Sequence, residues 1–208
     1  MDAVGLNFFE SSVRYVDPHH PETLALAATA RKMGLKVVGL FVNAGVATTV
    51  EHQRRLGLDL IQWHGDETLD ELANLNGQIR VPFIRAIKLP TGRLSTDRID
   101  ESVLPWSDAG AIVLLDVDGG RQHGGTGKRL DWPAIDRWRR GFDRPWILAG
   151  GLRPENIREA IRATGAARVD VASGVECPRG VKHAARVRAF ATGCRESFDR
   201  SGILTRDR

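Results

Sequence analysis

The 208-residue chain is 42% hydrophobic and 27% charged, which is typical of one globular domain with a sizeable core. Its formal net charge of +4 comes from scattered basic residues, so we expect an anionic small molecule as the partner and no nucleic acid. We expect no membrane span and no signal peptide, because no apolar run reaches about 18 residues and the start lacks a basic leader. Cys177 and Cys194 form neither a disulfide framework nor a metal-binding pair, so we expect a cytoplasmic protein without a metal site.

Short apolar runs rich in Val, Ile and Leu recur along the chain. Such runs are typical of parallel strands that are buried on both faces. The predicted strands cover residues 3–9, 36–43, 58–64, 81–89, 111–117, 145–149 and 168–173.

Amphipathic stretches with helical spacing lie between these runs. Pro21-Glu22 and Pro154-Glu155 are typical helix starts. The residues expected to share a buried helix face fall into three groups: Leu69, Leu72, Ala73 and Leu75; Ile157, Ala160 and Ile161; and Val187, Phe190, Cys194 and Phe198.

The alternation of strands and helices predicts an α/β fold with a parallel sheet. Either an open doubly wound sheet or a (β/α)8 barrel fits this pattern. No Gly-x-Gly-x-x-Gly follows the first strand, which argues against a dinucleotide fold. The length suits a compact barrel, although seven strands are one fewer than a barrel of this type has. We expect one domain over residues 1–198, followed by a polar tail over residues 199–208.

The first stretch that could carry chemistry is "LLDVDGGRQHGGTGKRLDW". Asp116 ends an apolar strand, and in a barrel such positions face the active site. A carboxyl group there can act as a general acid, although Asp116 could instead cap the turn. Residues 119–127 contain five glycines and predict a loop able to close over a ligand. The loop does not match the P-loop pattern.

Two later strands end in small residues, in "ILAGGLRPENI" and "VDVASGVE". Gly150 and Gly151 follow one strand, and Ser173 and Gly174 follow the other. Glycines let backbone N–H groups approach an oxyanion closely, and barrels often bind phosphate after their last two strands. The alternative is tight packing at the strand ends.

Two further stretches carry polar side chains near strand ends. In "LIQWHGDE", Gln62 and His64 lie on one side of a strand and Trp63 on the other. His64 could orient a substrate or be a satisfied structural histidine, while Asp66 and Glu67 are expected to begin the next helix. In "FFESSVRYV", Arg14 could bind a carboxylate with both guanidinium nitrogens, or be an exposed loop arginine.

These stretches, in this order, resemble the phosphoribosylanthranilate isomerase family of tryptophan biosynthesis. The matching pieces run to about Phe190: "VGLNFFESSVRYV", "VVGLFVN", "LIQWHGDE", "IRAIKL", "VLLDVDGG" with "GGTGKRLDW", "WILAGGLRPENI" and "VDVASGVE". The resemblance implies a (β/α)8 TIM barrel of the phosphate-binding type and no cofactor. Indole-3-glycerol-phosphate synthase is a rival, but it needs a catalytic lysine, and the context of Lys88 argues against that role.

The reaction that the resemblance implies is an Amadori rearrangement of N-(5-phosphoribosyl)anthranilate to 1-(2-carboxyphenylamino)-1-deoxyribulose 5-phosphate. A general acid opens the furanose ring, and a general base removes the proton from the sugar C2. The resemblance makes Asp116 the acid, Arg14 the partner of the anthranilate carboxylate, and His64 and Asp170 pocket-lining residues. It makes the phosphate site from Gly150, Gly151, Ser173 and Gly174.

The family's general base is a cysteine in a Lys-Ile-Cys-Gly segment, which this sequence lacks. Its opening, "DAVGLNFF", matches the family's second strand, so we expect a first strand–helix unit of roughly 20 to 25 residues to be absent. Either the natural protein is longer and Met1 is an internal methionine, or the chain is complete and is an impaired enzyme or non-catalytic phosphate-ligand-binding remnant. Cys177 is then a substitute base or an inert thiol. The family more often has Asp at His183. The oligomeric state is not predicted.

Overall fold

The computed structural model describes residues 2–118 and 129–201, and the chain forms two compact units. Unit 1 spans Met1–Ala86 and Pro105–Ile112, and unit 2 spans Ile87–Leu104 and Val113–Arg208. Three elements are divided between the units: β4 (Phe83–Leu89), α4 (Thr96–Asp108) and β5 (Ile112–Val117), of which only the first residue belongs to unit 1.

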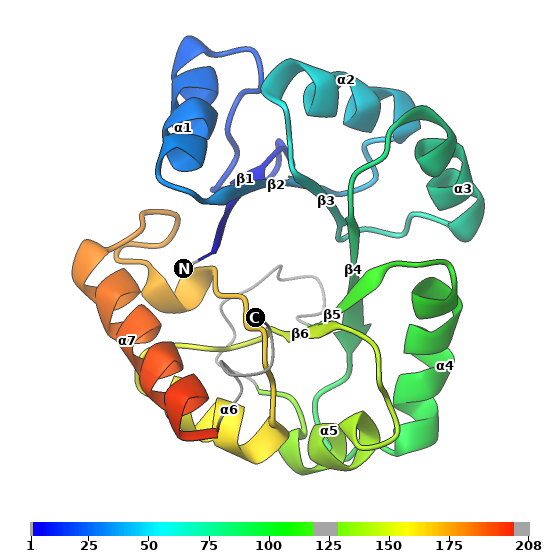
Figure 1. Cartoon of the computed structure of the whole chain (residues 1–208), viewed down its shortest axis with the longest axis vertical. Coiled ribbons are helices and arrows are strands. Elements are labelled where there is room, and N and C mark those ends of the chain that lie inside the picture. The colour runs from blue at the N-terminus through cyan, green and yellow to red at the C-terminus, as the bar shows by residue number, and fades with distance from the viewer. Residues whose placement is uncertain (1, 119–128, 202–208) are drawn as a thin grey trace. The chain divides into compact units, whose positions relative to one another are not determined.

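Unit 1 consists of parallel strands that alternate with helices (Figure 1). The register is fixed by pairs such as Val4 with Val37, Gly39 with Ile61, and Ile61 with Phe83. Helices α1, α2 and α3 all lie on one side of the strands. In chain order the elements are β1 (Ala3–Asn7), α1 (Pro21–Lys32), β2 (Lys36–Phe41), α2 (Val46–Leu56), β3 (Leu60–Trp63), α3 (Leu69–Gln78) and the first half of β4.

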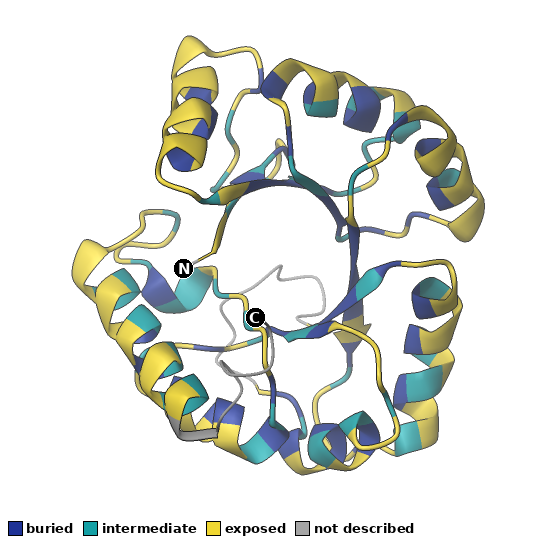
Figure 2. Cartoon of the chain, viewed as in Figure 1, coloured by how far each residue is buried: buried dark blue, intermediate teal, exposed yellow. Residues whose placement is uncertain are grey.

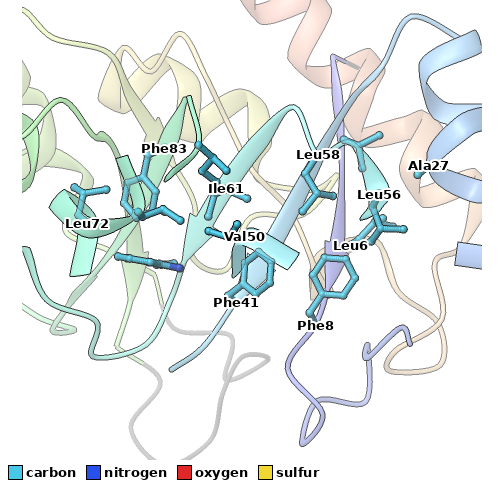
Figure 3. Close-up of a cluster of buried hydrophobic side chains, with 14 of the residues drawn as sticks. Leu6, Phe8, Ala27, Phe41, Val50, Leu56, Leu58, Ile61, Leu72 and Phe83 are labelled. Atoms are coloured by element: carbon cyan, nitrogen blue, oxygen red, sulfur yellow. The ribbon is translucent and has the colours of Figure 1, made fainter. Parts of the chain in front are cut away.

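The core of unit 1 fills the space between these strands and helices (Figure 3). Leu6 and Phe8 from β1 and the residues just after it pack with Phe41 and Ile61 from the next two strands. Trp63 is 1% exposed and stands edge-on to Phe83, with ring centroids 4.8 Å apart. The predicted alternation at this strand is confirmed, since Trp63 is in the core while Gln62 and His64 share the other side.

Local sequence signals account for the helix ends in unit 1. Helix α1 begins at Pro21, as predicted, and the His20 imidazole accepts a hydrogen bond from the Glu22 N–H. Helix α3 begins with a capping box, in which the Thr68 and Glu71 side chains each bind the other residue's backbone N–H. Helix α2 ends at Gly57, which has the left-handed conformation that glycine allows.

Unit 2 repeats the strand–helix alternation around β5 and β6, which pair in parallel through Val113–Trp146 and Leu115–Leu148. Figure 2 shows that its helices bury one face and expose the other, as their apolar spacing predicts; Ile157, Ala160 and Ile161 of α6 are buried. Besides parts of β4 and α4, the elements are β5 (Ile112–Val117), α5 (Trp132–Arg139), β6 (Trp146–Leu148), α6 (Ile157–Thr164), the 3-10 helix η1 (Ser173–Val175) and α7 (Ala184–Ser201).

The predicted strand over residues 168–173 is wrong. Val169 makes a single parallel bridge to Leu148, and the chain then turns into η1. The reason lies in β6, because Gly150 and Gly151 have φ angles of +76° and +67°, which a regular strand does not adopt. Strand β6 therefore ends at Leu148 and offers no further partner.

Not every residue expected on a buried helix face is buried. Leu69 and Ala73 of α3 are exposed, and Cys194 of α7 is half-buried. The buried face of α3 is narrower than its apolar spacing predicts, since Leu72 and Leu75 alone are buried there.

Three smaller expectations also differ from the structure. Helix α6 begins at Ile157 and not at Pro154, because the Asn156 side chain folds back on the Arg153 N–H at 2.9 Å and forms a separate turn. Ala3 and Gly5 of β1 are exposed, so this strand is not buried on both faces. Helix α7 continues through residue 201, while residues 202–208 and the glycine-rich loop over 119–128 lie outside the described residues.

Candidate active site

Asp116 lies at the end of β5 in unit 2 and is half-buried. One of its carboxylate oxygens accepts a hydrogen bond from the Val117 N–H at 2.7 Å. The neighbouring strand end carries Gly150, where a Cβ would stand 3.0 Å from that same oxygen and 2.7 Å from the Val117 nitrogen. Only a glycine fits at Gly150 without displacing the carboxylate, so the predicted acid and the first predicted phosphate residue are neighbours.

The two glycine segments of unit 2 are in direct contact. A Cβ on Gly174 would stand 1.8 Å from the Leu152 carbonyl oxygen and 3.0 Å from the Arg153 Cα. Real Cβ atoms do not approach a carbonyl oxygen so closely, and both atoms belong to the backbone. The segment after β6 and the segment that enters η1 therefore pack backbone to backbone, which requires glycine at position 174.

Side-chain donors occupy three carbonyl oxygens of these segments. The Asn156 amide donates to the Gly151 oxygen at 3.0 Å, the Lys182 ammonium to the Ala172 oxygen at 2.8 Å, and the Arg186 guanidinium to the Gly174 oxygen at 3.1 Å. In a trans peptide unit the N–H points away from the C=O. The N–H groups that share these peptide units therefore point away from the donors, an arrangement suited to an anion.

Asp170 follows the Val169 bridge and is exposed. Its N–H donates to the Leu148 carbonyl at 2.9 Å. Asp170 therefore lies beside the last residue of β6, the strand that the Gly150–Gly151 segment follows.

Cys177 and His183 both lie in the connection from η1 to α7. Cys177 is an exposed free thiol, and its N–H donates to the Val181 carbonyl at 2.9 Å. The connection is anchored by Lys182, which bonds the nearly buried Glu176 carboxylate at 3.0 Å. His183 contributes its backbone N–H, which donates to the Val175 carbonyl at 2.8 Å. The connection is therefore held by the Lys182 side chain and by the backbone N–H of His183.

Unit 1 holds the other two predicted site residues. His64 follows β3 and is half-buried, with its Nδ1 3.4 Å from the amide nitrogen of the buried Gln62. Arg14 lies in the turn after β1 and is also half-buried. Its backbone N–H donates to the Ser12 hydroxyl at 3.1 Å, and Ser12 in turn accepts from the Asn7 amide at 3.3 Å. Arg14 is thus held close to the end of β1.

A buried ion pair, which the sequence patterns did not predict, lies close to His64 in the chain. The Arg85 guanidinium donates to the Glu67 carboxylate at 2.6 Å, and the two side chains are only 10% and 2% exposed. Glu67 does not begin a helix as expected, because α3 begins after Thr68. A signal existed in the sequence, since a single arginine interrupts an otherwise apolar start to β4, "FIRAI".

Residues 2–118 and 129–201 contain no cluster of three or more His, Cys, Asp or Glu side chains placed to hold a metal ion. No helix in the same part of the chain is long and apolar enough to cross a membrane.

Parallel strands that alternate with helices, with a carboxylate and glycines at the strand ends, define an α/β protein of the TIM-barrel-like class. The crystal structure of phosphoribosylanthranilate isomerase from Thermotoga maritima has the same fold, with a TM-score of 0.80 and 30% identity over 94% of this chain and 88% of that one. A second solved isomerase, in complex with reduced 1-(o-carboxyphenylamino)-1-deoxyribulose 5-phosphate, gives a TM-score of 0.76 and 26% identity over the same shares.

Sequence comparison then identifies the family. The model of the family described as N-(5'-phosphoribosyl)anthranilate (PRA) isomerase matches residues 1–192. The N-(5'-phosphoribosyl)anthranilate isomerase of Neisseria meningitidis serogroup B is 39% identical over 91% of this chain and 84% of the relative. That of Myxococcus xanthus is 40% identical over the same shares. The chain belongs to the N-(5'-phosphoribosyl)anthranilate isomerase family, and the predicted family and fold class are confirmed.

Proposed function

We propose that the chain catalyses the Amadori rearrangement of N-(5'-phosphoribosyl)anthranilate in tryptophan biosynthesis. The observation that carries this proposal is the contact in unit 2 between the Asp116 carboxylate and Gly150, beside glycine segments whose carbonyls are already occupied. An acid next to an anion site suits a phosphorylated sugar whose ring oxygen must be protonated.

In this mechanism Asp116 donates a proton to the furanose ring oxygen, the ring opens and a Schiff base forms. Loss of the proton from the sugar C2 then gives an enolamine, which tautomerises to the ketone. The N–H groups of the segments around Gly151, Ser173 and Gly174 hold the phosphate, and Gly150 keeps room for the Asp116 carboxylate. Asp170 lines the pocket.

The anthranilate end of the substrate is assigned to unit 1. Arg14 binds the anthranilate carboxylate, and a planar guanidinium suits this because it can donate two parallel hydrogen bonds. His64 orients the aminoaldose beside the polar side chain of Gln62. In this proposal the partner is a small molecule, and neither nucleic acid nor a membrane surface takes part. We also propose that the protein works in the cytoplasm.

The test is an isomerase assay on the 208-residue chain, which follows the loss of fluorescence of freshly formed phosphoribosylanthranilate. We expect Asp116→Asn to lower kcat by a factor of about 10² to 10⁴, which is the usual contribution of a positioned proton donor. Binding of the reduced product analogue should persist in that variant. Activity that is unchanged by Asp116→Asn would reject Asp116 as the acid.

The general base is tested in the same assay. Cys177→Ser is expected to lower activity strongly only if this exposed thiol removes the C2 proton. If activity persists in Cys177→Ser, the base is another group. If the folded wild-type chain has no activity, adding a Lys-Ile-Cys-Gly strand upstream tests whether that segment supplies the base.

A further inference from the structure

The buried Glu67 carboxylate is hydrogen-bonded to two different strand-end loops of unit 1. Its Oε1 accepts from the Asn43 N–H at 2.8 Å, in the loop after β2. Its Oε2 accepts from the Gly65 N–H at 3.0 Å, in the loop after β3. The same Oε2 receives the Arg85 guanidinium at 2.6 Å, so one carboxylate joins β4 to both loops.

Gly65 is fixed at both ends by this ion pair. Besides the N–H bond to Glu67, its carbonyl oxygen accepts from the second Arg85 nitrogen at 3.0 Å. Asn43 closes the arrangement, because its side-chain oxygen accepts from the Asp66 N–H at 2.7 Å. A Cβ on Gly65 would stand 2.2 Å from that oxygen. We call Glu67, Arg85, Asn43 and Gly65 the Glu67 network.

His64 immediately precedes Gly65 and is therefore fixed from both sides. Its N–H donates to the Phe41 carbonyl at 2.9 Å, which continues the pairing of β3 with β2. On its C-terminal side, His64 is joined to Gly65, whose N–H and carbonyl oxygen are both bound by the Glu67 network. The direction of its Cα–Cβ bond is thus set by β2 on one side and by Glu67 on the other.

Stability alone does not explain this arrangement. Burying two charges incurs a large desolvation cost, and an apolar pair of similar size is often as stable or more so. Helix α3 already has the Thr68–Glu71 capping box and does not need Glu67 to begin. The Arg85 Nε is buried without a hydrogen-bond partner among the described residues, although the guanidinium lies 4.2 Å from the centre of the Trp106 ring.

We propose that Glu67 is a positioning residue, which with Arg85 sets the orientation of His64 toward the anthranilate part of the substrate. This inference rests on the proposed function, since it takes its substrate from there. Its distinguishing consequence is coupling: Glu67 should matter for ligand binding only while His64 is present. A group that merely stabilised the fold would act independently of His64.

The experiment is a double-mutant cycle of Glu67→Gln and His64→Ala, with the dissociation constant of the reduced product analogue measured by titration calorimetry. We expect Glu67→Gln to weaken binding about tenfold in the wild-type background, as the loss of a charged hydrogen bond allows. In the His64→Ala background we expect a further change of less than about twofold. Competition by inorganic phosphate, which the glycine segments of unit 2 bind in our proposal, should be unaffected.

A second variant covers the case in which Glu67→Gln does not fold. Asn43→Gly removes both side-chain hydrogen bonds to Asp66 but leaves no buried charge unpaired. Glycine readily adopts the φ of +52° found at this position. This variant should weaken binding about threefold, again only while His64 is present. Circular dichroism and urea unfolding verify the fold of each variant.

Equal losses in both backgrounds, or no loss in a folded Glu67→Gln, would overturn the inference while leaving the proposed function in place. Failure of the wild-type chain to bind the analogue would instead overturn the proposed function, and the inference would fall with it.

Discussion

His52 on α2 is an almost buried histidine, 8% exposed, whose imidazole lies among the aromatic side chains of unit 1. Its ring centroid is 5.2 Å from that of Phe8 and 5.9 Å from those of Phe41 and His19. The Nδ1 atom is buried and has no hydrogen-bond partner among the described residues. This is an environment for a neutral imidazole, not for an imidazolium ion.

Burial lowers the pKa of His52 below the ordinary value of 6.5. Among the charged groups that face it, Glu51 and Asp17 raise the pKa, while His19 and Arg55 lower it, and burial is the largest effect.

The lowered pKa of His52 predicts a loss of stability in mild acid. Below pH 6.5 the unfolded chain binds a proton that the native chain does not, so the free energy of unfolding falls as the pH drops toward the native pKa. The slope from one such group is at most about 1.4 kcal/mol per pH unit. Urea unfolding at pH 7.5 and at pH 5.5 measures the decline.

His52→Leu is the matched control, because it keeps an apolar side chain in the cluster and removes the titration. The fall in the free energy of unfolding from pH 7.5 to pH 5.5 should be smaller in this variant, because His52 no longer binds a proton on unfolding. An equal decline in both proteins would assign it to other groups.

At the scale of elements, the strand ends of unit 2 depend on close backbone contact. Gly174→Ala would place a methyl group 1.8 Å from the Leu152 carbonyl oxygen. Since neither backbone can move without displacing η1 or the segment after β6, we expect a loss of about 1–3 kcal/mol in the free energy of unfolding. We also expect inorganic phosphate to bind at least about tenfold more weakly, because the backbone N–H groups proposed to hold it would move apart.

Gly77→Ala is the control for this prediction. Gly77 lies in α3, no atom stands within 4 Å of the added Cβ, and alanine favours a helix by up to about 1 kcal/mol over glycine. This variant should unfold at a slightly higher urea concentration and bind phosphate normally. Intact phosphate binding in Gly174→Ala would remove η1 from the proposed phosphate site.

At the scale of the whole molecule, ligand binding and stability are linked. A ligand that binds only the native chain adds about 2.7 kcal/mol to the free energy of unfolding at a concentration of 100 Kd. For a protein of 208 residues this should raise Tm by roughly 5–10 °C. The reduced product analogue should therefore produce such a shift in differential scanning calorimetry.

Anthranilate without the phosphoribosyl group is the comparison ligand, and it should give a much smaller shift at the same concentration. Equal shifts for the two compounds would show that the phosphate does not contribute to binding, which contradicts the assignment of the glycine segments.

The sequence by itself determined the alternation of strands and helices, the start of α1 at Pro21, and the grouping of polar residues and glycines after strands. These features follow from short-range effects: apolar periodicity, capping and the conformational freedom of glycine act within a few residues. The motif order also determined the family, since each motif is local. Placing Asp116 at the end of a strand and Gly150 just after another required no knowledge of distant contacts.

The tertiary structure decided which of these local preferences prevailed and which distant groups met. Residues 168–173 have strand-like composition but form one bridge, because β6 ends at Leu148, shortly before Gly150 and Gly151, and offers no longer partner. Glu67 and Arg85 are 18 residues apart, and only the pairing of β3 with β4 brings them together. An ion pair is buried when the fold supplies all its partners at once, and nothing within a few residues of Glu67 specifies that arrangement.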